Sequence, residues 1–251
     1  MTDPRELDRY EAAYRDVFQH HDENVWMIEW YVEKVEAVLR RDGARSAISL
    51  GIGHGGVCTR LASLLGSTLE RYTVVEGSGA ILREFQDRSP SAPGLQFVHG
   101  MFEEFSPGQP VDAVEMGFVL EHVDDPVGLL RQYASYLAPR GTLFIGVPNA
   151  LSLHRRLGVA AGLLADPFAL NGSDRQLGHK RYFDLDSLRR AVAEAGLVPR
   201  RTEGIYLKPL STGQLQSLAL PRNVLLAMFR VGEAYPELCN GIYLEAVLPP
   251  A

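Results

Sequence analysis

The sequence predicts an α/β protein built around a parallel, doubly wound sheet. Short apolar runs alternate with segments of helical periodicity, and the first run ends in a glycine-rich turn that opens a helix. Such units are expected to join into one sheet through right-handed crossovers. A chain of 251 residues with 46% hydrophobic composition can bury one large core, so we expect a single domain over residues 1–251.

The first part of the chain holds the regular part of this pattern. Residues 5–40 place apolar side chains at helical spacing and predict a helical segment before the core. Five short apolar runs predict strands at 47–50, 72–76, 95–98, 111–116 and 142–147. Helices are expected in the connections, and the helix with apolar positions at 129–137 is expected to stop at the proline and glycine of 139–141.

The pattern changes after the fifth strand. Residues 150–182 form a long connection with some helical character, and Asp184 is the predicted N-cap of the helix that follows. Two further strand-like runs, 198–207 and 242–248, flank a helical insertion near 211–234.

Composition narrows the class of function. The formal net charge of −6 argues against a broad nucleic-acid surface, and no run of about 18 apolar residues predicts a membrane span. The N-terminus lacks the pattern of a secretory signal, so we expect a cytoplasmic protein. Cys58 and Cys239 show no metal-ligand spacing and are expected to be packed thiols.

The glycine turn at 51–56 predicts a nucleotide site. Without side chains at Gly51, Gly53 and Gly55, the backbone can approach a ligand closely where a strand turns into a helix. Glu76 ends the next strand, and its two carboxylate oxygens could accept hydrogen bonds from both hydroxyls of an adenosine ribose. These features alone fit NAD as well as other adenosine cofactors, or a purely structural turn.

Later segments resemble class I S-adenosylmethionine-dependent methyltransferases. Residues 112–126 (DAVEMGFVLEHVDDP) and 137–149 (LAPRGTLFIGVPN) are similar to that family's fourth and fifth strand motifs, and 178–183 (GHKRYF) with 195–197 (AGL) resemble the continuation in many small-molecule members. The resemblance, which covers residues 45–205, implies S-adenosylmethionine as cofactor. It also implies a Rossmann-like seven-stranded sheet of order 3-2-1-4-5-7-6, with the last strand antiparallel. A nicotinamide enzyme would be expected to continue in parallel units.

The resemblance also implies roles for single residues. The three glycines would approach the methionine and ribose, with Glu76 on the ribose hydroxyls, Met101 and Phe102 along the adenine, and Met116 and Gly117 at the amino-acid end. Two positions depart from the family pattern. Ser49 stands where members usually place an acidic residue, and Met101 stands where an aspartate commonly contacts the adenine.

Methyl transfer from a sulfonium needs alignment and exclusion of water, and no protein nucleophile. A base could remove the proton of an acceptor hydroxyl or ammonium, and we select His179 with Tyr182 and His154 as alternatives, although each could be structural. Glu121 and His122 follow a pattern that binds magnesium in some methyltransferases, but Phe118 replaces the first carboxylate. One Glu and one His are a poor start for a hard cation, so we expect no metal.

The acceptor is expected to lie beside the less regular segments. Residues 1–44 would form a helical lid, 45–149 the cofactor-binding core, and 150–182 with 208–236 two substrate-side insertions. Arginines here could pair with an acceptor carboxylate or phosphate, although clustered charges are often only solvated. The candidate acceptor-binding residues are Tyr14, Trp26, Trp30, Asn149, Arg155 and Arg181.

The sequence therefore predicts methyl transfer to a small-molecule acceptor, anionic in one version of the hypothesis, with oxygen or nitrogen favoured over carbon. Neither nucleic acid nor a membrane is an expected partner, and the oligomeric state is left open. Three alternatives stay open at this point: a protein or RNA acceptor, a non-catalytic binding module of the same fold, and an NAD-dependent oxidoreductase.

Overall fold

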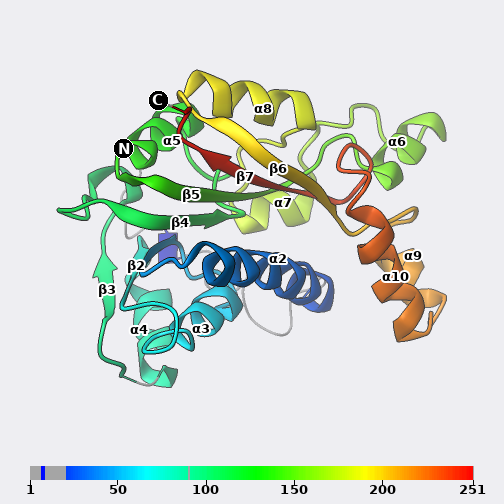
Figure 1. Ribbon diagram of the computed structural model, residues 1–251. Coiled ribbons are helices and arrows are strands. Elements are labelled where there is room, and N and C mark those ends of the chain that lie inside the picture. The colour runs from blue at the N-terminus through cyan, green and yellow to red at the C-terminus, as the bar shows by residue number, and fades with distance from the viewer. Residues whose placement is uncertain (1–6, 9–20, 90, 251) are drawn as a thin grey trace.

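The computed structural model describes residues 7–8, 21–89 and 91–250 (Figure 1). Its centre is a seven-stranded sheet of order β3-β2-β1-β4-β5-β7-β6, which confirms the predicted topology. Strand β7 runs antiparallel to β5 and β6, while the other paired neighbours are parallel. The strands are β1 Ser46–Leu50, β2 Arg71–Glu76, β3 Leu95–His99, β4 Val111–Gly117, β5 Leu137–Pro148, β6 Val198–Ile205 and β7 Gly241–Val247.

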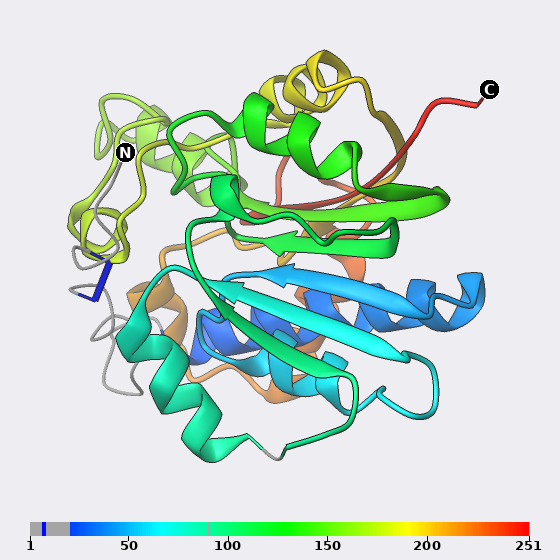
Figure 2. The same cartoon turned by 90° about the vertical axis from the view of Figure 1, so that its left-hand side faces the viewer.

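Helices cover both faces of this sheet (Figures 1 and 2). Helices α2 and α3 pack together on one face, and α5 and α8 pack together on the other. The helices are α2 His21–Asp42, α3 Gly56–Ala62, α4 Gly79–Arg88, α5 Pro126–Ala134, α6 Leu153–Ala160, α7 Gly172–Leu177, α8 Leu185–Glu194, α9 Thr212–Ser217 and α10 Arg222–Gly232, with a short 3₁₀ turn, η2, at Phe102–Glu104.

Alternation along the strands divides the core into two layers, because successive side chains point to opposite faces. In β1, Ile48 and Leu50 pack with α5 and α8, while Ala47 packs with α2 and α3. The predicted apolar face of α2 is confirmed: Tyr31, Val32, Val35, Val38 and Leu39 are all buried. The sheet is therefore covered on both sides, as its nearly continuous apolar strands require.

Capping groups fix several helix starts. The Asp184 side chain accepts a hydrogen bond from the Ser187 amide, which confirms the predicted N-cap of α8. Asp125 caps α5 in the same way through the Gly128 amide, directly after the turn that follows β4. This cap sets the point at which the chain leaves the carboxyl end of β4.

One predicted boundary was wrong. Helix α5 ends at Ala134, and Leu137 begins β5 opposite Val111, so 139–141 fall within an irregular part of the strand instead of ending the helix. Strand pairing therefore overrode the helical spacing of Leu137. The predicted helical insertion near 211–234 is confirmed and consists of two helices, α9 and α10, with Pro221 at the N-cap of the second.

None of the described helices combines the length and apolarity that crossing a bilayer would require.

Candidate functional site

The glycine turn joins β1 to α3 in a conformation that favours glycine. Gly51, Gly53 and Gly55 have φ values of 81°, 52° and 77°, in the left-handed region. Gly51 N–H donates to the Val75 carbonyl at 2.8 Å, and this bond holds the turn against β2. All three glycines line a large cavity at the carboxyl ends of the strands.

Glu76 ends β2 beside this turn and also lines the cavity. One of its oxygens accepts from the Ile52 amide at 2.9 Å and the other from the Ser78 amide at 2.7 Å. Burial raises the pKa of this carboxyl group, while these backbone donors act in the opposite direction. Each oxygen keeps an acceptor site, so Glu76 can bind a ribose hydroxyl while it holds two loops.

The other residues expected at the cofactor lie around the same end of the cavity. Met101, Phe102 and Gly117 line it, whereas the Met116 side chain is buried in the core and does not. The Phe102 carbonyl accepts from Tyr133 at 2.9 Å, which fixes η2. At Gly117, a Cβ would lie 2.6 Å from the Tyr31 ring, so only glycine fits there.

Ser49, the departure at the end of β1, is fully buried and accepts a hydrogen bond from the Tyr72 hydroxyl at 2.8 Å. In the sheet register it lies opposite Glu115 of β4. A carboxylate is therefore present on the neighbouring strand at the level where β1 has a hydroxyl.

The cavity has a volume of about 1290 Å³, above the roughly 300–1,000 Å³ usual for one small-molecule site. It extends from the glycine turn to the segments that follow β5 and β6. Apolar side chains from these segments line its far end, namely Leu157, Leu163, Leu164, Leu177 and Leu210. The cavity can therefore hold a second molecule beside the cofactor.

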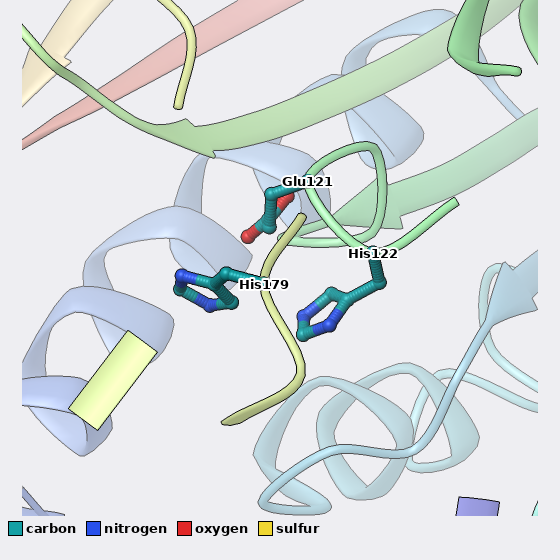
Figure 3. Close-up of side chains that lie close together, drawn as sticks. All are labelled: Glu121, His122 and His179. Carbon is teal, nitrogen blue, oxygen red and sulfur yellow. The ribbon is translucent and has the colours of Figure 1, made fainter. Parts of the chain in front are cut away.

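Three titratable side chains meet between these two ends (Figure 3). Glu121 and His122 lie in the turn after β4, and His179 comes from the end of the long connection. The segment is held there because the Lys180 amide donates to the Glu121 carbonyl at 2.8 Å. The two imidazole rings lie 4.9 Å apart, edge to face, and all three residues line the cavity.

Glu121 is the unusual member of this cluster. Its side chain is 0% exposed, and neither carboxylate oxygen has a hydrogen-bond donor among the residues that the structure describes. Burial raises its pKa to about 7, although the nearby His179 opposes the shift. Burial and His179 lower the pKa of His122 to about 3, so that ring is neutral. A buried carboxyl group without partners is costly, and such groups gather at functional sites.

The cluster could also hold a cation. One ligand atom from each of Glu121, His122 and His179 lies within 4.8 Å of the other two. Carboxylate and neutral imidazole are ligands of divalent transition metals. The expectation of no metal considered only Glu121 and His122 as ligands. The fold brings His179 to them as a third possible ligand, and the absence of a metal stays a prediction.

The two alternative bases are placed differently from His179. The Tyr182 hydroxyl donates to Asp174 at 2.8 Å and accepts from Arg155, so it holds the connection and is a poor base. His154 lines the cavity, but burial lowers its pKa to about 3, and its Nδ1 shares a hydrogen bond with Ser152. His179 Nδ1 lies 3.4 Å from an Asp174 carboxylate oxygen.

Most of the expected acceptor-binding residues are engaged elsewhere. Arg155 lines the cavity, but its guanidinium donates to the carbonyls of Pro167 and Ala169 and stacks over Tyr182, so it is not available to an anion. Arg181 donates to the Asp124 carbonyl and lies outside the cavity lining.

The remaining acceptor candidates that the structure describes lie away from the cavity. Asn149 is buried and binds the carbonyls of Pro236 and Cys239, which is a structural role. Trp26 and Trp30 pack in the α2 core layer and do not line the cavity. Tyr14 lies outside the described residues.

Sequence reasoning missed two features of the acceptor end. From the sequence, Glu121 was considered only as part of an incomplete metal-binding pattern, because its partner His179 is distant in sequence. A buried network of Lys208, Glu23, Thr212 and Asn240 also reaches the cavity, with Lys208 Nζ 2.5 Å from Glu23. No sequence spacing could have joined these residues, since they come from α2 and the segments after β6 and α10.

Comparisons with known proteins agree with this geometry. Residues 18–201 match the family model described as a methyltransferase domain. A ubiquinone biosynthesis O-methyltransferase from Parvibaculum lavamentivorans is 29% identical over 112 residues, which are 41% of this chain and 40% of that protein. The chain thus matches less than half the length of this curated relative.

Solved structures share the whole fold. The magnesium protoporphyrin IX methyltransferase of Synechocystis PCC 6803, with bound S-adenosylhomocysteine (SAH), has a TM-score of 0.63 at 17% identity, covering 97% of this chain and 94% of that one. The N-methyltransferase NodS of Bradyrhizobium japonicum WM9, also with SAH, has a TM-score of 0.57 at 13% identity, covering 97% and 100%. The glycine turn, Glu76, the strand order and the family match together lead to one conclusion: the chain belongs to the methyltransferase domain family.

Proposed function

We propose that this protein transfers a methyl group to a hydroxyl group of a small molecule with an apolar body. The observation that carries the proposal is Glu121, a buried carboxylate without hydrogen-bond donors that lines the cavity between its cofactor end and its apolar end. A hydroxyl must lose its proton during methylation, and a carboxylate held in the cavity can take it. The partial match to an O-methyltransferase supports oxygen as the acceptor atom.

The lining of the cavity supports a neutral acceptor. Its three cationic side chains among the described residues are all engaged: Arg155 with carbonyls, Lys180 with Asp124 and Lys208 with Glu23. An anionic acceptor would have to break one of these contacts. The leucines at the far end instead favour an apolar ring or chain. They come from the predicted insertions at 150–182 and 208–236, which supports a substrate-side role for both.

The chemistry requires little from the protein beyond placement and one proton transfer. S-adenosylmethionine supplies the methyl group from its sulfonium. The acceptor oxygen would take the methyl group as the C–S bond breaks, and the hydroxyl proton would pass to Glu121. His179 lies in one cluster with this carboxylate, with its Nδ1 3.4 Å from Asp174, and would orient the acceptor hydroxyl. Exclusion of water by the two insertions keeps the charges in a low-dielectric site.

The test is a panel of acceptors with isotopically labelled S-adenosylmethionine. Neutral phenols and catechols with apolar substituents should be methylated, and the matched anilines, a carboxylate analogue, RNA and protein extracts should not. His179→Ala should lower turnover on the active phenol by about 10²-fold and leave SAH affinity unchanged. Arg181→Ala, which alters a neighbouring residue outside the cavity, is the matched control and should keep its activity.

Two results would contradict the proposal. If the anilines were methylated in preference to the phenols, the acceptor atom would be nitrogen. If only macromolecules were labelled, the acceptor would be a protein or RNA. A series with and without a chelator shows separately whether the cluster needs a divalent ion. Binding of SAH without transfer to any acceptor class would favour a non-catalytic module.

A further inference from the structure

Glu115 in β4 is a buried carboxylate that faces the cavity without a counter-ion. Its side chain is 3% exposed and lines the cavity together with Gly51 and Gly117. None of the ion pairs formed among the described residues includes it. Burying a carboxylate is costly unless hydrogen bonds or an opposite charge offset the loss of water.

Neutral donors hold this carboxylate in one orientation. Tyr31 Oη donates to Oε1 at 2.9 Å, and the Gly117 amide donates to the same oxygen at 2.6 Å. Ser49 lies opposite Glu115 on β1, and its oxygen accepts from Tyr72 at 2.8 Å. Donors from α2 and β4 thus fix the position of the carboxylate. Its oxygens can still accept hydrogen bonds from a cationic ligand.

These neighbours do not neutralise the charge. Burial raises the pKa of Glu115 to about 7, while the Gly117, Ser49 and Tyr31 donors act in the opposite direction. The titratable groups that face it are Tyr31 from α2, Tyr72 from β2 and Cys58 from α3. Burial raises the pKa of each of them, so all three are neutral near pH 7. A cationic ligand is the missing partner.

The cofactor brings such a cation to this place. With the adenosine bound at Glu76, Met101 and Phe102, as the family resemblance implies, the amino-acid end would reach across the glycine turn to β4. We propose that Glu115 binds the α-ammonium group of the cofactor's amino-acid end, in place of an acidic residue at Ser49. Ser49 and Glu115 lie opposite one another on the adjacent strands β1 and β4. A carboxylate on β4 can therefore take the place of one on β1.

Other cavity-lining carboxylates are committed elsewhere. Glu23 pairs with Lys208, Asp124 pairs with Lys180, and Asp125 caps α5. Glu76 is held by two loop amides at the ribose end, and Glu121 lies in the acceptor cluster with His179. Asp174 accepts from Tyr182, and Glu103 and Glu104 are exposed on η2. Glu115 is therefore the carboxylate whose position and charge match the ammonium.

Titration calorimetry with two ligands tests this assignment. SAH carries the ammonium, whereas 5′-methylthioadenosine has the same adenosine and a thioether but no amino-acid end. Glu115→Gln keeps an acceptor oxygen for Tyr31 and Gly117, so thermal unfolding should show an intact fold. We expect the dissociation constant for SAH to rise by at least about tenfold and that for methylthioadenosine to stay within about twofold, since only a charge-assisted hydrogen bond is lost.

Three further arms make the result specific. Glu76→Gln, the control at the ribose end, should weaken both ligands alike. Ser49→Asp in the Glu115→Gln background should restore much of the SAH affinity by returning a carboxylate to the opposite strand. Wild-type affinity for SAH should fall as the pH drops below about 7, where Glu115 gains a proton, and the Gln variant should lack this dependence. Equal weakening of both ligands in Glu115→Gln, or unchanged SAH binding, would overturn the proposal.

Discussion

The two ends of the cavity differ in how their carboxylates are satisfied. At the cofactor end, both oxygens of Glu76 accept from backbone amides, and Glu115 accepts from Tyr31 and from the Gly117 amide. At the acceptor end, Glu121 is equally buried and has no donor among the described residues. The cofactor end is therefore organised by the fold itself, whereas the acceptor end is left incomplete until an acceptor or an ion reaches it.

This difference indicates that the acceptor end is less stable than it could be, because its carboxyl group is kept for function. An unpartnered buried carboxyl group costs about 1–3 kcal/mol or more, a cost that a purely structural site would avoid. The same incompleteness leaves Glu121 free to take a proton. We therefore expect substitutions at the cofactor end to change affinity, and substitutions at the acceptor end to change turnover.

The largest effect should follow from filling the glycine turn. Gly53→Leu places a bulky side chain where the backbone meets the cofactor, and φ of 52° adds strain. SAH binding should become undetectable by calorimetry, a loss of about 100-fold or more. Gly43→Leu is the matched control, since φ there is 67° and a Cβ would meet nothing within 4 Å. If Gly53→Leu bound SAH normally, the turn would not be the cofactor site.

A smaller loss of affinity should follow from removing the ribose acceptor. Glu76→Ala should weaken SAH binding by roughly 1–3 kcal/mol, because charge-assisted hydrogen bonds to the hydroxyls are lost and the Ile52 and Ser78 amides lose their acceptor. Glu84→Ala on the exposed face of α4 removes a carboxylate that pairs with Arg88, and it should leave the affinity unchanged. Unchanged binding in the Glu76 variant would refute the ribose assignment.

The smallest effect should appear in stability, at the acceptor end. Burial tends to raise the pKa of Asp174, but hydrogen bonds from His179, the Asn171 amide and Tyr182 hold it below its ordinary value. A lowered pKa means that the charged form stabilises the fold above pH 4 and that this stabilisation is lost as the pH falls through the folded-state value. Asp174→Asn should cost about 1–2 kcal/mol in urea unfolding at pH 7. The difference from wild type should shrink below about pH 4; a difference independent of pH would contradict the account.

The sequence predicted the fold well because its signals were local. The glycine turn, the strand alternation and the Asp184 cap each act within a few residues, and each was found. The errors arose where a distant partner decided the structure. Leu137 has helical spacing but pairs with Val111, and this contact placed it in β5.

The same distinction explains the site. Glu76 could be found from its spacing after the glycine turn, and it lines the cavity as expected. The tryptophans of α2 could not be placed, because an amphipathic helix does not show whether its rings face a core or a cavity. The importance of Glu121 depends on His179, which the sequence separates from it by a strand, three helices and a long connection.

The most direct test of the contrast between the two ends is Glu121→Gln, measured both for SAH affinity and for turnover of the acceptor. The account predicts a dissociation constant for SAH within about twofold of wild type and a turnover lowered by about 10²-fold or more, because the isosteric amide cannot take the hydroxyl proton. Turnover close to wild type in the folded variant, or a parallel loss of SAH affinity, would contradict it.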